Sequence, residues 1–103
     1  MKPKLVRDRI PELISIEGRI PQYHTIESGE LYLQALIEKL DEEIKEFEES
    51  KNLDELSDIL EVVYALAAYL GVEPMEVEAI RQKKRSERGG FDRRVFLDKI
   101  VSP

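Results

Sequence analysis

The chain has 103 residues, a net charge of −6 and no cysteine. This length fits a single domain, residues 1–103, and the lack of cysteine excludes disulfides and cysteine-based zinc sites. An acidic chain is poorly suited to stable binding of nucleic acid. The longest apolar stretch, residues 62–70, is far short of the ~20 residues that span a bilayer, and the charged residues 1–9 lack the apolar run of a secretory signal. We therefore expect a cytoplasmic protein with neither a membrane nor a nucleic-acid partner.

The N-terminal part is expected to contain one short helix and an extended connection. Residues 5–17 have a helical pattern around Pro11, which suits a first helical turn, and Gly18 is placed to end the helix. Residues 19–26 contain Pro21 and several residues that favour extended backbone. They are expected to form an extended connection or a short strand.

Two long helices are expected to follow. Ser28 is placed to cap a helix over residues 29–49, in which apolar side chains recur three and four positions apart along one face. That face consists of Leu33, Leu36, Ile37, Leu40, Ile44 and Phe47. After a short break, Asn52 opens a second helix over residues 53–70, and Gly71 suits the position just past its end. The second half of this helix is apolar all round, which predicts burial on several sides, one of them against another subunit.

A last helix is expected over residues 74–87, beginning at Pro74 and ending before Gly89 and Gly90. Residues 91–101 fit a strand and a short helix equally well. The pattern as a whole predicts an all-α fold, an antiparallel bundle of about four helices with short extended segments. A bundle this small leaves apolar surface uncovered, so we expect it to be completed by oligomerisation, as a homodimer or a dimer of dimers.

Each long helix carries two acidic residues, three positions apart, at the border of its apolar face. On a helical wheel, Glu43 and Glu46 lie at this border in the first helix, whereas Glu42 points away from the face. Glu55 and Asp58 repeat the pattern in the second helix. A short connection makes the two helices antiparallel neighbours, with Glu46 about 5 Å from the connecting end of its helix and Glu55 and Asp58 about 3–8 Å from theirs, so both acidic pairs meet at one level.

Four converging carboxylates would repel one another, and a hard divalent cation removes that conflict. Mg²⁺, with Mn²⁺ as a substitute, is also the usual companion of a polyphosphate substrate. The spacing therefore predicts a metal site. The alternative is that Glu55 belongs only to a capping box with Asn52, and that the other carboxylates are ordinary solvated charges.

The distribution of charge is compatible with this prediction. Residues 38–61 carry eleven acidic and three basic side chains, whereas residues 81–94 carry seven basic and two acidic ones. A metal–polyphosphate site requires an acidic segment beside a basic one, and Lys84, Arg85 and Arg88 are candidates to clamp phosphates. The alternative is a pair of solvated helix faces, with the basic cluster placed to suit the dipole at a helix C-terminus.

Two stretches of these helices resemble a known pair of motifs. Residues 40–46 have the sequence LDEEIKE and residues 55–60 have ELSDIL. They resemble the E-x-x-E and E-x-x-D motifs of the MazG-like, or all-α, NTP pyrophosphohydrolase superfamily. Residues 4–12 (KLVRDRIPE) and 84–91 (KRSERGGF) resemble flanking motifs of its phosphoribosyl-ATP pyrophosphohydrolase-like subgroup. The connector between the two central motifs has only eight residues, fewer than in MazG itself.

The resemblance implies Mg²⁺-dependent cleavage of a nucleoside triphosphate between its α- and β-phosphates, with house-cleaning of non-canonical nucleotides as a fitting role. The metal ligands that it implies are Glu43, Glu46, Glu55 and Asp58, of which Glu43 and Glu46 also take part in catalysis. The phosphate-binding residues that it implies are Arg7, Lys84, Arg85 and Arg88. Two alternatives stay open: hydrolysis of phosphoribosyl-ATP, and a non-catalytic dimeric helical interaction module.

Overall fold

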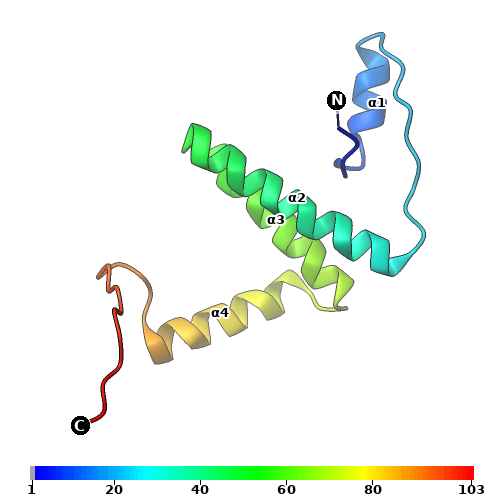
Figure 1. Cartoon of the computed structure of the whole chain (residues 1–103). Helices are drawn as coiled ribbons and strands as arrows, with labels where there is room; N and C mark the ends of the chain where they lie inside the picture. The colour runs from blue at the N-terminus through cyan, green and yellow to red at the C-terminus, as the bar shows by residue number, and fades with distance from the viewer. Residues whose placement is uncertain (1) are drawn as a thin grey trace.

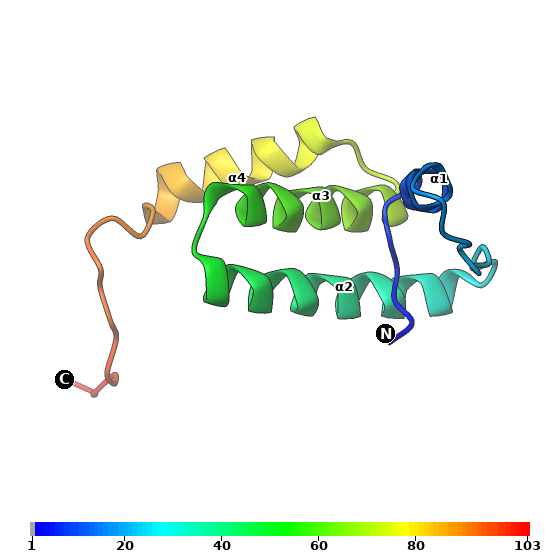
Figure 2. The same cartoon turned by 90° about the horizontal axis from the view of Figure 1, so that it is seen from above.

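The computed structural model describes residues 2–103, and in that range it contains four helices and no strand, which confirms the all-α prediction. The helices are α1 (Ile10–Ile16), α2 (Gly29–Ser50), α3 (Leu53–Tyr69) and α4 (Pro74–Arg88). Helices α2 and α3 lie side by side and antiparallel (Figures 1 and 2). In the described part of the chain, α4 packs only on α3, and α1 packs on no other helix. None of these helices is both long enough and apolar enough to cross a membrane.

The first helix is shorter than the sequence pattern suggested. It begins at Ile10 rather than at residue 5, with Pro11 in its first turn. A helix begun at residue 5 would place Pro11 in its interior, where the proline ring clashes with a carbonyl of the preceding turn. Gly18 follows the helix with a φ of +88°, in the left-handed region that glycine tolerates best. Residues 19–26 form an extended connection rather than a strand.

The two predicted caps fix where the long helices begin. The Ser28 hydroxyl accepts a hydrogen bond from the Leu31 N–H at 3.3 Å, and the Asn52 side-chain oxygen accepts one from the Glu55 N–H at 3.2 Å. Between the helices, Lys51 adopts a left-handed conformation with a φ of 55°. This tight reversal brings the C-terminal end of α2 beside the N-terminal end of α3.

The C-terminal part follows the prediction up to the end of α4. Pro74 lies in the first turn of α4, and Gly89, with a φ of +83°, follows its last residue. Residues 91–103 form neither of the two structures that the sequence allowed. They extend away from the helices with exposed side chains (Figure 1).

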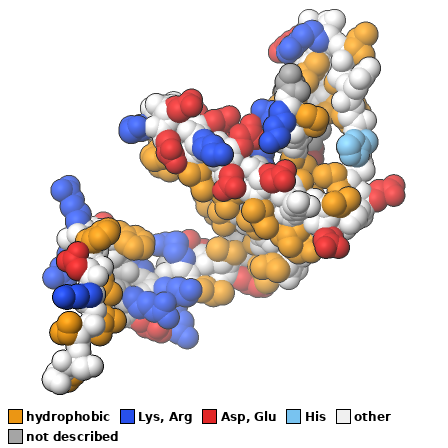
Figure 3. Space-filling model, viewed as in Figure 1, with side chains coloured by type: hydrophobic (Ala, Val, Ile, Leu, Met, Phe, Trp, Pro, Cys, Tyr) orange, Lys and Arg blue, Asp and Glu red, His pale blue; other side chains and the backbone are white. Residues whose placement is uncertain are grey.

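The apolar core of a single chain is small. Among the described residues, only Leu36, Val62 and Ala67 are buried hydrophobic side chains, and they belong to α2 and α3. Tyr69, the last residue of α3, and Leu70, which follows it, are 39% and 76% exposed. The radius of gyration is 18.2 Å, compared with about 13 Å for a compact chain of this size. Much apolar surface therefore remains open in one chain, as the space-filling view shows (Figure 3).

Candidate metal centre

Four carboxylates from α2 and α3 meet beside the connection between these helices. One oxygen atom from each of Glu43, Glu46, Glu55 and Asp58 lies within 4.8 Å of the others. Ligand atoms on opposite sides of one Mg²⁺ ion are about 4.2 Å apart, because each Mg–O bond is about 2.1 Å long. A slight contraction would therefore allow one ion to contact these residues, which we call the carboxylate cluster. The three-residue spacing within each helix places each pair on one helix face.

Glu43 is the buried member of the cluster, with 6% of the residue exposed. Its Oε1 atom lies 3.3 Å from the ammonium of Lys39, whereas its Oε2 atom is buried and has no hydrogen-bond partner. Burial raises the pKa of Glu43, the Lys39 ammonium opposes that rise, and the Glu46 carboxyl adds to it. A buried oxygen without a partner is costly, and a cation held by the cluster would satisfy it. The residues present therefore fit a divalent metal ion.

Glu42 lies outside the carboxylate cluster, as its helical phase predicts, but it is not a free surface charge. Its side chain is 27% exposed and accepts hydrogen bonds from Lys4 at 2.8 Å and from Lys39 at 3.1 Å. Burial alone would raise the pKa of Glu42, but the two ammonium groups outweigh that effect and lower it. The physical reason is that the N-terminal segment lies against this side of α2, and a wheel of one helix does not include such a neighbour.

Two lysines of this network were missed at the sequence level. Lys39 precedes Glu42 and Glu43 by three and four positions, which is the spacing of side-chain pairs on one helix face, so the signal was present. Lys4 is 38 residues from Glu42 and has no local signal. Only the folded chain shows that the two lysines share one carboxylate.

Arg7 lies at the edge of the carboxylate cluster. Its Nη2 atom donates a hydrogen bond to Oδ1 of Asp58 at 2.8 Å. The Arg7 side chain is 55% exposed and that of Asp58 is 37% exposed, so the ion pair is open to solvent. The resemblance placed Arg7 among the phosphate-binding residues, and the structure places it beside a predicted metal ligand.

The basic residues near the end of α4 do not join the cluster within one chain. Lys84, Arg85 and Arg88 are exposed, and Arg85 lies 3.3 Å from Asp92. Among the described residues, none of the three forms a hydrogen bond or ion pair with the four carboxylates. Arg85 and Arg88 lie in the last turn of α4, where cations suit the helix dipole. Their contact with substrate phosphates remains a prediction.

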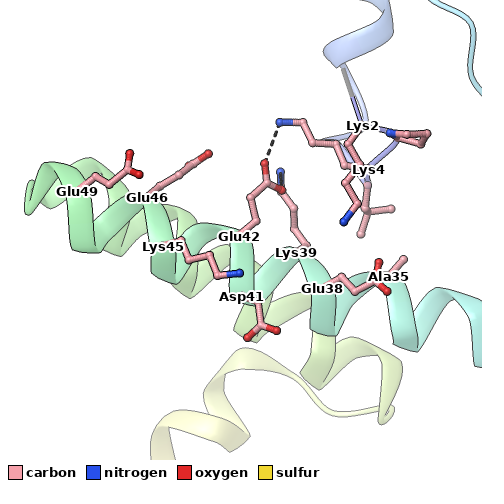
Figure 4. A pocket seen from close by; sticks show the side chains of 12 residues that line it. Lys2, Lys4, Ala35, Glu38, Lys39, Asp41, Glu42, Lys45, Glu46 and Glu49 are labelled. Carbon is pink, nitrogen blue, oxygen red and sulfur yellow. Dashed lines mark hydrogen bonds and ion pairs between the residues drawn. The ribbon is translucent and has the colours of Figure 1, made fainter.

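A pocket of about 500 Å³ lies between the N-terminal segment and α2 (Figure 4). Basic side chains in its lining are Lys2, Lys4, Lys39 and Lys45, and acidic ones are Glu38, Asp41, Glu42, Glu46 and Glu49. Glu46 belongs to both the pocket and the cluster. The pocket therefore adjoins the cluster, and its lining carries four ammonium groups and five carboxylates.

Comparison with known proteins gives little further information. No family model and no solved structure matches the chain. The chain is 49% identical over 51 residues to an uncharacterized protein of Mycolicibacterium smegmatis (strain ATCC 700084 / mc(2)155), a match that covers 50% of this chain and 51% of the relative. The chain thus spans about half the length of that relative. The match assigns no activity, and the resemblance to the MazG-like superfamily stays a prediction.

Proposed function

We propose that the protein is a Mg²⁺-dependent nucleoside triphosphate pyrophosphohydrolase, which cleaves the bond between the α- and β-phosphates to give a monophosphate and pyrophosphate. The observation that carries this proposal is the meeting of four carboxylates at Glu43, whose Oε2 atom is buried and has no hydrogen-bond partner. Clustered carboxylate oxygens suit Mg²⁺ and Mn²⁺. The resemblance of the motifs supports the choice of substrate.

The residues of the site would have different tasks. The ion would be held by Glu43, Glu46, Glu55 and Asp58. Mg²⁺ bound there supplies charge for the phosphate oxygens and an activated water. Glu43 and Glu46, adjacent carboxylates on α2, are the candidates to accept the proton of the attacking water. Arg7, at the open edge of the cluster, is placed to stabilise charge that develops on a phosphate.

Two other functions use the same chain differently. Hydrolysis of phosphoribosyl-ATP would need the same metal site with another substrate. A non-catalytic interaction module would use the exposed apolar surface and would leave the carboxylates solvated. The burial of Glu43 disfavours the module, because a carboxylate with no role in binding gains nothing from losing its hydration.

The proposed enzyme should be stabilised by Mg²⁺ or Mn²⁺. An ion that binds only the folded chain stabilises it by about 2.7 kcal/mol at 100 times its Kd, which is measurable as a rise in melting temperature. Pyrophosphate release from a panel of nucleoside triphosphates, with phosphoribosyl-ATP included, would then identify the substrate class. Release should require the metal and stop in chelator. If the protein showed neither stabilisation by metal nor pyrophosphate release, the proposed enzyme would be rejected in favour of the non-catalytic interaction module.

We also propose that the chain self-associates as a homodimer or a dimer of dimers. Ile37 and Ile44 of α2 are 50% and 40% exposed, and Leu56 and Leu60 of α3 are 46% and 47% exposed. Each pair is spaced to share one face of its helix, so the two pairs extend the apolar surface beyond the contact between α2 and α3. Monomeric proteins rarely expose apolar surface of this kind, and a second copy would cover it.

Light scattering should therefore give twice or four times the chain mass of 12.0 kDa at micromolar concentration. Replacement of Leu60 by glutamate should lower that mass, because a charge in an apolar contact loses its hydration. Glu61→Gln, at an exposed neighbouring position, is the matched control and should leave the mass unchanged. A parent protein that stays monomeric at high micromolar concentration would contradict self-association.

A further inference from the structure

The N-terminal segment forms two ion pairs with α2 and α3, one beside the carboxylate cluster and one with a member of it. Lys4 pairs with Glu42, which lies outside the cluster, at 2.8 Å. Arg7 pairs with Asp58, which lies inside it, at 2.8 Å. A metal ion that takes Asp58 as a ligand would compete with Arg7 for the same carboxylate, but it would leave the pair of Lys4 and Glu42 intact.

We propose that Arg7 is the internal counter-ion of Asp58 in the metal-free protein, and that metal binding transfers its guanidinium from Asp58 to a phosphate of the ligand. This inference rests on the proposed function and extends it, because it makes metal binding and anion binding depend on one side chain. Arg7 is 55% exposed, so its guanidinium is free to leave Asp58.

The ion pair between Lys4 and Glu42 holds the N-terminal segment on α2, so the released guanidinium of Arg7 stays close to the site. Lys4 is three residues from Arg7, so the backbone between them spans at most about 11 Å. The pocket of about 500 Å³ lies under the same segment and is bordered by Glu46 of the cluster. Residues 2–5 line this pocket on one side and α2 lines it on the other (Figure 4). A phosphate that extended from the metal toward the pocket would therefore lie beside the segment that leads to Arg7.

Lys39, the other cation beside the cluster, is placed for a different role. Its side chain is 16% exposed and contacts both Glu42 and Glu43. It can stay on Glu42 while Glu43 binds metal through Oε2, the oxygen without a partner. Among residues 2–103, Arg7 pairs with Asp58 and with no second carboxylate, so metal binding at Asp58 would displace Arg7.

The test is the affinity for Mn²⁺ alone, measured by calorimetry at low ionic strength for the parent, Arg7→Gln and Arg9→Gln. Arg9 is the matched control, because it carries the same charge in the same segment but pairs with Glu12 at 3.2 Å. Arg7→Gln should bind Mn²⁺ about two- to five-fold more tightly than the parent, which is the range expected when a solvent-exposed ion pair no longer competes. Arg9→Gln should match the parent.

A second measurement follows the other half of the exchange. With Mg²⁺ saturating, inorganic pyrophosphate should bind Arg7→Gln about ten-fold more weakly than it binds the parent or Arg9→Gln, since a charge-assisted hydrogen bond is lost. Melting curves in chelator establish that each variant is folded. If Arg7→Gln bound Mn²⁺ no more tightly than the parent, or bound pyrophosphate equally well, this inference would be overturned but the proposed function would not. A parent protein that binds no Mn²⁺ would overturn the proposed function as well.

Discussion

Glu43→Gln should abolish the stabilisation by Mg²⁺ and lower pyrophosphate release by about 100-fold or more, since a loss of roughly 3 kcal/mol of transition-state stabilisation corresponds to that factor. In chelator the same variant should be at least as stable as the parent. The amide keeps the size of the side chain but removes a charge that burial and the Glu46 carboxyl both disfavour. Thermal melting with and without Mg²⁺, together with a pyrophosphate assay, measures both effects.

The stability gain of Glu43→Gln should depend on pH. Because the pKa of Glu43 is raised in the folded state, the folded chain holds this proton to a higher pH than the unfolded chain does. Ionisation of Glu43 therefore costs stability as the pH rises above about 4.5, the usual value for a glutamate. The gain from the amide should be present at neutral pH and should disappear once the pH falls below that value.

The matched control is Glu48→Gln, which removes one charge from an exposed position of the same helix outside the cluster. It should keep the metal response and the activity of the parent. Glu42→Gln is a poorer control, because the Glu42 carboxylate holds both Lys4 and Lys39. If Glu43→Gln and Glu48→Gln behaved alike, the position of a carboxylate on the helix would not matter, and the metal site would be rejected.

The sequence was informative wherever local chemistry decides the structure. Ser28 and Asn52 were identified as caps because their side chains satisfy backbone N–H groups at the start of a helix, and both do so in the structure. Asn52, together with the left-handed Lys51, sets the register of α2 against α3 across a tight connection. With that register, a helical wheel was sufficient to expect Glu43 and Asp58 at one level, and the structure places them in one cluster.

The sequence was uninformative where distant segments meet. The pairing of Lys4 with Glu42 and of Arg7 with Asp58 joins residues 38 and 51 positions apart, and no local pattern encodes such contacts. For the same reason the helical wheel could not show that Lys4 covers Glu42. The exposure of Leu70 could not be predicted either. Apolar periodicity shows that a helix face needs a packing partner, but it does not show whether the same chain supplies that partner.

The largest loss of stability is expected for Leu36→Ala. Leu36 is 2% exposed and is one of the three buried hydrophobic residues among those described, so its truncation removes packing between α2 and α3 and leaves a cavity. Such a change costs about 2–5 kcal/mol, a large part of the roughly 5–15 kcal/mol that stabilises a typical domain. Urea unfolding followed by circular dichroism measures the cost. The metal response should weaken in parallel, because α2 and α3 each supply two carboxylates of the cluster.

Ile37→Ala separates the core from the proposed interface. Ile37 is the next residue on α2 and is 50% exposed in one chain, so its truncation should cost less than about 1.5 kcal/mol in dilute, monomeric protein. At concentrations where copies associate, the cost should rise, because a second chain then buries the same side chain. Leu36→Ala should cost about the same at every concentration. If the two variants lost equal stability in dilute protein, Leu36 would not be the core residue between α2 and α3 that the structure indicates.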